Sequence, residues 1–404
     1  MPATLGAIEP MPYLTAVRDQ LRRTEPEVWA FFASASAQAE HVAALRMDLL
    51  KTTYRLDQES HPELHAALAE AAARLGVEDT VTLYQAHQPA PEQPNAGVIS
   101  VPGAAHVVFS GGLLDLLSAG ERLAVLGHEL AHHVLATAGD GSLQVAGRVL
   151  DAAAAARGAQ PSHGETARLF RLHTEVAADR GALAAAVDLP SVVSALVKLV
   201  TGLRTASGSS YLKQAAEIFA AGPGAGSAGL SHPELFVRAR ALDLWAQHGQ
   251  DAEGEIAALL RGSPGLDRLD LPGQERLTGL TLRLWAQALR PAWAHTDPVL
   301  AHARQFAPEL SPAPGGDPEL GAEILDLGLA AAEYLSFVLL DFATADPDVA
   351  DAALAHALAL SGELGFGAAF DRIAGRELGL RGSQVAKLRS AAAATVAAAR
   401  EDVR

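Results

Sequence analysis

Hydrophobic positions in the first part of the chain recur at the spacing of helices. In residues 11–57 the apolar side chains that follow a three-to-four-residue period include Val28, Phe31, Phe32, Val42, Leu45 and Leu49. This period is typical of amphipathic helices. A further helix is expected from His61 to Leu75, because Pro62 suits a first helical turn and Gly76 suits the position just after a helix.

The pattern then changes to that of β-strands. Residues 80–84 alternate in the manner of a strand, and two β-rich runs, 97–101 and 106–110, are joined by Pro102-Gly103. Alternation interrupted by turn residues predicts a hairpin or two neighbouring strands. The strands stop after this region, so a small sheet is predicted within a mainly helical chain.

Helical periodicity returns in the middle of the chain. Ser118 and Glu121 have the spacing of a capping box, so a helix is expected to begin just after Ser118 and to run to about Ala138. The next helix is expected at 165–187, and helical character continues from residue 189 to about residue 221.

The first of these helices carries the motif His128-Glu129-x-x-His132. Residues four apart lie on one face of a helix, so both imidazoles can reach one metal ion, and Glu129 can reach a water on that ion. This is the H-E-x-x-H arrangement of zinc peptidases. The alternative is a surface helix that happens to carry histidines. His133 points about 100° away from His132 and is interpreted as a packing residue rather than a ligand.

The second helix carries a matching pair of carboxylates. Glu175 and Asp179 are again four residues apart. A catalytic zinc site takes three protein ligands, and a metal-bound histidine usually donates its other nitrogen to a carboxylate. The pair can supply both groups. A solvated acidic face is the alternative, but the small apolar residues between them, Val176, Ala177 and Ala178, favour a buried face.

Composition narrows the choice of chemistry. The chain has 404 residues, 49% of them hydrophobic and 19% charged, which indicates a globular protein of two or three domains. A formal net charge of −16 argues against a nucleic-acid partner or an anionic membrane surface. Without cysteine, any zinc must be held by histidine and carboxylate.

Targeting signals are not evident. The N-terminal segment lacks a basic start followed by an apolar run, so no signal peptide is expected. The most apolar windows contain charges: Lys198 lies within 189–203, and three acidic residues lie within 324–345. Since a membrane span needs about 20 apolar residues, the sequence predicts a cytoplasmic protein without a transmembrane anchor.

The sequence changes character after the middle helices. A Gly-rich segment, 222–229, precedes Ser231-His232-Pro233, and Arg238 follows. His232 can belong to a mobile loop end or to a helix start with Ser231 as the cap. Beyond about residue 250 only amphipathic helices are expected, at 255–261, 274–289, 319–342, 349–364 and 383–399.

Several motifs, in this order, resemble one family. They are Pro94-Asn95-Ala96, Val108-Phe109-Ser110-Gly111-Gly112-Leu113, His128-Glu129-Leu130-Ala131-His132, Glu175-Val-Ala-Ala-Asp179, and Ser231-His232-Pro233 with Arg238. The chain resembles the catalytic domain of the gluzincin superfamily that includes the CAAX prenyl proteases and the HtpX-type membrane proteases. Most members are anchored by transmembrane helices and this sequence shows none, so a prenylated membrane substrate is not expected.

The resemblance implies roles for individual residues. His128, His132 and Glu175 would bind one Zn²⁺ per chain, and Asp179 would orient a ligand histidine. Glu129 would be the general base on a zinc-bound water. His232 and Arg238 would act in catalysis, for example by stabilising the oxyanion, or His232 would cap the resting zinc. Asn95, Ala96, Gly97 and Val98 would bind substrate at a sheet edge, where an extended peptide can add as a strand.

The expected fold is therefore mainly α with a small β-sheet. An N-terminal helical extension, 1–54, would precede a zincin-like peptidase domain, 55–248, and an all-helical C-terminal domain, 249–404. The expected function is a zinc-dependent metalloendopeptidase acting on peptides or unfolded protein segments. The alternatives are a latent or non-catalytic zinc protein that acts as a chaperone-like or partner-binding scaffold, and a chain whose C-terminal helical domain recruits a protein partner.

Overall fold

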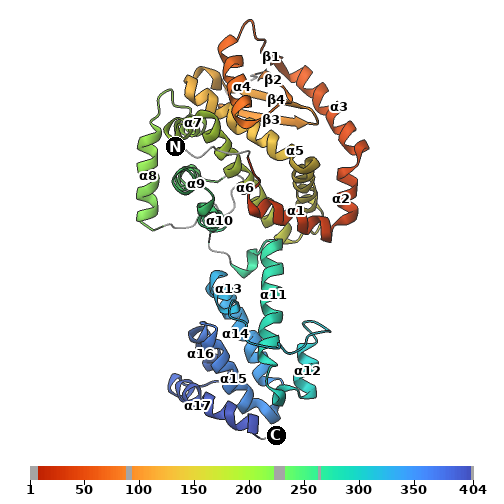
Figure 1. Cartoon of the computed structure of the whole chain (residues 1–404), viewed down its shortest axis with the longest axis vertical. Coiled ribbons are helices and arrows are strands. Elements are labelled where there is room, and N and C mark those ends of the chain that lie inside the picture. Colours follow the sequence, from red (N-terminus) through yellow and green to blue (C-terminus); the bar gives the residue numbers. More distant parts are fainter. Residues whose placement is uncertain (1–7, 88–92, 223–232, 263–264, 402–404) are drawn as a thin grey trace. The chain divides into compact units, whose positions relative to one another are not determined.

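The computed structural model describes residues 8–87, 93–222, 233–262 and 265–401. It divides into two compact units, Met1–Gly262 and Ser263–Arg404 (Figure 1). The first unit contains a small sheet among helices, and the described part of the second is helical. The predicted class, mainly α with a small β-sheet, is confirmed.

The sheet has four strands in the order β1-β2-β4-β3: β1 (Thr53–Arg55), β2 (Thr80–Ala86), β3 (Asn95–Val101) and β4 (Ala104–Ser110). β3 and β4 form the expected antiparallel hairpin, β4 is parallel to β2, and β1 is antiparallel to β2. β3 is an edge strand. The sequence did not indicate β1, because three residues are too few to show an alternation.

One face of the sheet is buried against helices. Along β4 the buried residues alternate, with Ala105, Val107 and Phe109 pointing into the core. Val107 and Phe109 join Leu126 and Leu130 of a long helix in one hydrophobic cluster. The period-two pattern of the strand and the helical stripe therefore meet at a common core.

The helices of the first unit are α1 (Pro12–Thr24), α2 (Pro26–Ala33), α3 (Ala35–Thr52), α4 (Pro62–Leu75), α5 (Ala119–Ala155), α6 (Pro161–Ala186), α7 (Leu189–Thr201), α8 (Gly208–Ala220), α9 (Leu235–His248) and α10 (Glu253–Arg261). Short 3₁₀ turns lie at Leu113–Asp115 and Gly249–Ala252. Helix α5 contains a sharp change of direction at Ala138–Gly141, where three residues have positive φ. Its first straight part therefore ends where the sequence predicted, and a second part continues to Ala155.

Helices α5 and α6 pack unusually closely because small residues face each other. A Cβ built on Gly127 would lie 2.4 Å from the Cβ of Ala185, and one on Gly181 would lie 2.3 Å from the Cβ of Ala131. Such distances leave no space for a methyl group. We call these four residues the glycine-alanine contact; they let the two helices that carry the predicted metal ligands approach each other.

The N-terminal helices differ from the expected extension. Leu14, Val17 and Leu21 of α1 are buried, and Tyr13 stacks on His173 of α6 with the ring centroids 4.4 Å apart. By contrast, Phe31, one of the apolar residues whose spacing predicted a helix here, is 64% exposed. The segment that the sequence set apart as 1–54 thus packs into the first unit through a stripe on α1.

The first unit also extends past the boundary expected at residue 248. Arg180 of α6 forms an ion pair with Glu253 of α10 at 2.5 Å, and its guanidinium lies over the ring of Trp245 in α9 at 3.8 Å. These contacts hold α10 in the first unit, which ends at Gly262.

The second unit is built from α11 (Leu271–Ala288), α12 (Asp297–Ala303), α13 (Leu320–Asp326), α14 (Leu329–Thr344), α15 (Ala350–Glu363), α16 (Gly367–Glu377) and α17 (Gly382–Glu401), with 3₁₀ turns at Leu266–Arg268, Ala292–Ala294 and Pro347–Val349. Its core includes Trp285, Phe342 and Phe370. The helix expected at 319–342 is two helices, because Gly328 adopts a φ of 89° between them. A partner-binding role for this unit stays a prediction. No helix in the described part of the chain has the length and apolar character to cross a membrane.

Candidate active site

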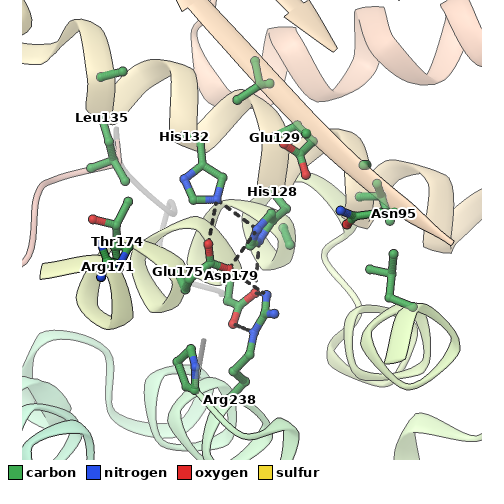
Figure 2. A pocket seen from close by; sticks show the side chains of 18 of the residues that line it. Asn95, His128, Glu129, His132, Leu135, Arg171, Thr174, Glu175, Asp179 and Arg238 are labelled. Carbon is green, nitrogen blue, oxygen red and sulfur yellow. Dashed lines mark hydrogen bonds and ion pairs between the residues drawn. The ribbon is translucent and has the colours of Figure 1, made fainter. Parts of the chain in front are cut away.

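A cleft of about 830 Å³ lies between the sheet edge and helices α5, α6 and α7. The predicted substrate-binding residues, Asn95, Ala96, Gly97 and Val98, all line it from edge strand β3. His128, Glu129, His132, Glu175, Asp179 and Arg238 line it as well. The structure therefore gathers the predicted site residues that it describes in one cavity (Figure 2). His232 lies outside the described residues.

Three potential ligand atoms converge in the cleft. The Nε2 atoms of His128 and His132 are 3.1 Å apart. Each lies 3.6 Å from an oxygen of Glu175, Oε2 for His128 and Oε1 for His132. Figure 2 shows the two rings and the carboxylate facing one another. Among the described residues this is the group of histidines and carboxylates compact enough for a metal ion.

The spacing of these atoms fits zinc. Four tetrahedral ligands at about 2.0–2.1 Å from a zinc ion lie roughly 3.3 Å from one another. The observed separations, 3.1 Å and twice 3.6 Å, bracket that value. Two imidazoles and one carboxylate are also a known ligand set of catalytic zinc sites that leave a fourth position open.

Comparison with known proteins agrees with this geometry. Residues 58–246 match the profile of Peptidase family M48. This match covers 189 of the 404 residues, so just under half of the chain is similar to peptidase family M48. A protein of Arabidopsis thaliana named "Plastoglobule-localized metallopeptidase 48, chloroplastic" is 29% identical over 226 residues, which cover 50% of this chain and 62% of that protein. The chain thus spans less than two thirds of that relative's length. No solved structure matches the chain.

The match confirms the resemblance that the motifs suggested. The matched part of the chain is similar to metallopeptidases, and metallopeptidases of family M48 depend on zinc. All three candidate ligands lie inside the matched range. The His-His-Glu group is therefore the candidate zinc site of this chain.

Two local features of the sequence position the ligands. Ser118 caps α5: its side chain accepts from the Glu121 amide, and the Glu121 carboxylate accepts from the Ser118 amide at 2.7 Å. This confirms the predicted capping box and sets where the helix begins. The glycine-alanine contact then sets the distance to α6, since both Gly127 and Ala131 lie next to ligand residues in the sequence.

The capping box belongs to a larger buried group. The Glu121 carboxylate also accepts from Ser194 Oγ at 2.6 Å and from Lys198 Nζ at 2.7 Å, both on α7. We call Ser118, Glu121, Ser194 and Lys198 the cap cluster. Burial alone would raise the pKa of Glu121, but the bonds from Lys198 and Ser194 outweigh it and lower that pKa.

Asp179 lies behind the candidate ligands, next to His128. Its Oδ1 is 3.1 Å from Nδ1 of His128, a close electrostatic contact whose angles are not those of a hydrogen bond. Arg238 donates to the same carboxylate through Nε at 2.8 Å and Nη2 at 2.5 Å. Its Nη2 also lies 3.7 Å from Glu175 Oε2. The sequence did not indicate this Arg238–Asp179 pair, and a role for Arg238 at the oxyanion stays a prediction.

The electrostatics of these buried groups have identifiable causes. Burial disfavours a charged His132, and the neighbouring His128 adds to this, so the pKa of His132 falls to about 4. Burial has the same tendency at His128, but the contact and charge of Asp179 and the charge of Glu175 outweigh it and raise the pKa. Asp179 keeps a lowered pKa because Arg238 and His128 outweigh its burial.

Glu129 lies beside the ligands and behaves differently from the other carboxylates. Its side chain lines the cleft, and burial raises its pKa to about 7, with a further contribution from the charge of Glu175. A carboxylate with a pKa near 7 is suited to proton transfer at neutral pH.

His133 was interpreted from the sequence as a packing residue rather than a metal ligand. Its side chain is buried, and its Nε2 lies 2.9 Å from an oxygen of Asp79.

Proposed function

We propose that this protein is a zinc-dependent metalloendopeptidase that hydrolyses peptide bonds in peptides or unfolded protein segments. The observation that supports this most directly is the convergence of His128, His132 and Glu175 beside Glu129 in one cleft. The similarity of residues 58–246 to peptidase family M48 supports the same reaction.

The proposed roles follow from the donor set and its neighbours. His128, His132 and Glu175 would hold one zinc ion. When bound, zinc supplies Lewis acidity that lowers the pKa of a water and polarises a carbonyl. Glu129 would accept the proton of the attacking water and pass it to the leaving amine, which its pKa of about 7 favours.

The outer residues of the site would keep the ligands in place. Asp179 would fix the ring of His128 through Nδ1, which leaves Nε2 directed at the cleft. Arg238 would balance the charge of Asp179 through its two donated bonds. In this arrangement Arg238 is a positioning residue for Asp179, and any contact with substrate would be additional.

The edge of the sheet supports a peptide substrate. β3 borders the cleft and pairs on one side only, with β4. An extended peptide can add to such an edge through backbone hydrogen bonds, which tolerate many side chains. We therefore propose that Asn95, Ala96, Gly97 and Val98 bind the substrate backbone next to the zinc site.

The test combines metal content with cleavage. Purified protein should carry one zinc per chain by plasma mass spectrometry and should cleave an unfolded, fluorescently labelled protein. A chelator should abolish cleavage and added zinc should restore it. Glu129→Gln should keep its zinc yet lose about 10²- to 10⁴-fold in kcat/KM, the usual contribution of general-base catalysis.

Two results would contradict the proposal. If the purified protein held no stoichiometric zinc, even after incubation with zinc salts, the proposed metal site would be wrong. Zinc-loaded protein that binds unfolded chains but cleaves none would favour the alternative of a scaffold with a non-catalytic site.

A further inference from the structure

A cationic side chain lies in the part of the cleft that the zinc site does not use. The change of direction at Ala138–Gly141 turns the second part of α5, and the residues of this part that line the cleft include Leu143, Gln144, Gly147 and Arg148. Arg171 and Thr174 of α6 line the same cleft and lie together in Figure 2, across the Glu175 carboxylate from Asn95.

Arg148 differs from the neighbouring arginine in its partners. Arg171 forms an ion pair with Asp151 at 2.9 Å, and both side chains are about half exposed or more. Within the described residues, no carboxylate lies within ion-pair distance of Arg148, and its guanidinium makes no hydrogen bond there. Arg148 is nevertheless partly buried, and burial lowers its pKa.

Partial burial without a partner penalises a cation for the water that it loses, and a ligand carboxylate would offset this penalty. The overall charge of the chain makes this position unusual, since the sequence carries 47 acidic and 31 basic residues. The other two arginines that line the cleft, Arg171 and Arg238, each have a carboxylate partner. Arg148 is thus the cleft-lining arginine that has no carboxylate partner among the described residues, so a ligand could supply one.

The strand edge directs a peptide toward this cation. Gln144 donates from Nε2 to the carbonyl of Ser100 at 3.2 Å, near the end of β3. That carbonyl is therefore already paired, and a peptide added along the edge would pair with the part from Asn95 to about Ile99. Arg148 lies one helical turn after Gln144, so it would meet the peptide where the pairing stops.

We propose that Arg148 is a specificity residue that binds a carboxylate of the substrate, so that the cleft prefers peptides with a carboxylate at the position beside it. The carboxylate has two possible sources, an Asp or Glu side chain and the C-terminal carboxylate of a peptide. This inference rests on the proposed peptidase function for the nature of its ligand.

The experiment measures binding and cleavage separately. Zinc-loaded Glu129→Gln protein, which should bind without cleaving, is titrated with fluorescent peptides by anisotropy. The peptides form matched pairs: Glu or Gln at each position in turn, and a free or an amidated C-terminus. The same pairs are given to the protein with Glu129 intact, and cleavage products are identified by mass.

The expected result is about a tenfold preference for the carboxylate member of one pair, the size of one charge-assisted hydrogen bond. A preference at one internal position identifies a side chain, and a preference only for the free C-terminus identifies the terminal carboxylate. In the Glu129→Gln background, Arg148→Gln should remove the preference and Arg148→Glu should reverse it, so that the uncharged member of the pair binds more tightly. Arg148→Lys should retain part of it, which guards against a folding defect in the neutral variant.

Arg157→Gln is the matched control, because it removes one exposed arginine just after α5 that does not line the cleft. A preference that persists in Arg148→Gln, or no preference for either kind of carboxylate, would overturn the inference. Cleavage without a carboxylate preference would overturn only this inference. Arg148-dependent carboxylate binding without any cleavage would instead overturn the proposed function.

Discussion

Helix α5 holds two buried polar clusters that are built in opposite ways. In the cap cluster, at the start of the helix, the Glu121 carboxylate accepts from Ser118, Ser194 and Lys198. Further along, two imidazole nitrogens lie 3.1 Å apart and face the Glu175 carboxylate. In the cap cluster, hydrogen-bond donors surround one acceptor, the Glu121 carboxylate. In the second cluster, nitrogen and oxygen atoms with lone pairs surround one point, where a metal ion could bind.

The pKa values reflect this difference. The bonds of the cap cluster outweigh burial and lower the pKa of Glu121, so its charge is stabilised by the chain itself. At the metal site burial lowers the pKa of His132 to about 4 and raises that of Glu129 to about 7. Shifts of pKa that burial causes, and that no partner within the protein offsets, are typical of groups that act on a ligand. Buried charge alone therefore does not identify a functional site; the balance of donors and acceptors does.

The largest expected effect comes from removing a candidate ligand at the proposed metal site. Zinc at a thousandfold excess over its Kd should stabilise the protein by about 4 kcal/mol. His132→Ala should lose this zinc-dependent gain, because only two of the three ligands remain. Denaturant unfolding with and without zinc measures it. Glu129→Gln is the control and should keep the gain; an equal gain in His132→Ala would show that zinc binds elsewhere.

Breaking the cap cluster should affect stability but not zinc. Lys198→Met leaves a buried Glu121 without its cation and should lower the free energy of unfolding by about 3 kcal/mol. Urea unfolding measures the change, and plasma mass spectrometry should still find one zinc per chain. Adding Glu121→Gln should recover part of the loss, because the unpaired charge is then gone. Loss of zinc in Lys198→Met would contradict the independence of the two clusters.

Asp179→Asn tests how the metal site depends on its outer residues. Removing such a partner of a ligand histidine typically weakens metal affinity by about 10- to 100-fold. A competition titration with a zinc-sensitive dye would measure the affinity. Asp151→Asn provides the comparison, since Asp151 also pairs with an arginine but is 68% exposed. Equal affinities in the two variants would mean that Asp179 does not support His128.

The smallest expected effect is in the pH dependence of stability. Because the folded-state pKa of Glu121 is lowered, its contribution is fully present above the unfolded value of about 4.5. It is lost as the pH falls through the lowered folded pKa, since the unfolded chain binds the proton more readily. Glu121→Gln should therefore flatten the fall in stability below pH 4.5, as followed by thermal unfolding. An unchanged profile would mean that other groups cause the acid sensitivity.

The parts of this molecule that could be predicted from the sequence depend on local spacing. The capping box, the His128–His132 pair and the Glu175–Asp179 pair each lie within one helical turn or little more. The pairing of Lys198 with Glu121 joins residues 77 positions apart, and in the sequence Lys198 only interrupts an apolar window. Contacts of that range need the tertiary fold.

The structural roles of the glycines were the hardest to predict from the sequence. Gly328 breaks a stretch whose apolar period predicts one continuous helix, because periodicity does not register a single positive φ. Gly127 and Gly181 show the opposite case, since both lie inside helices and weaken them locally. These two glycines allow α5 and α6 to pack closely, because no Cβ fits between the helices at either position.

The glycine-alanine contact has a consequence for how the metal is acquired. It fixes the separation of α5 and α6 through side-chain packing, and these packing contacts hold in place the two helices that carry the ligand atoms. Domains that fold only around zinc spend much of the metal's binding energy on ordering the chain. Here we expect zinc to exchange with a folded apoprotein as a simple equilibrium, so that the supply of free zinc sets the fraction of active molecules.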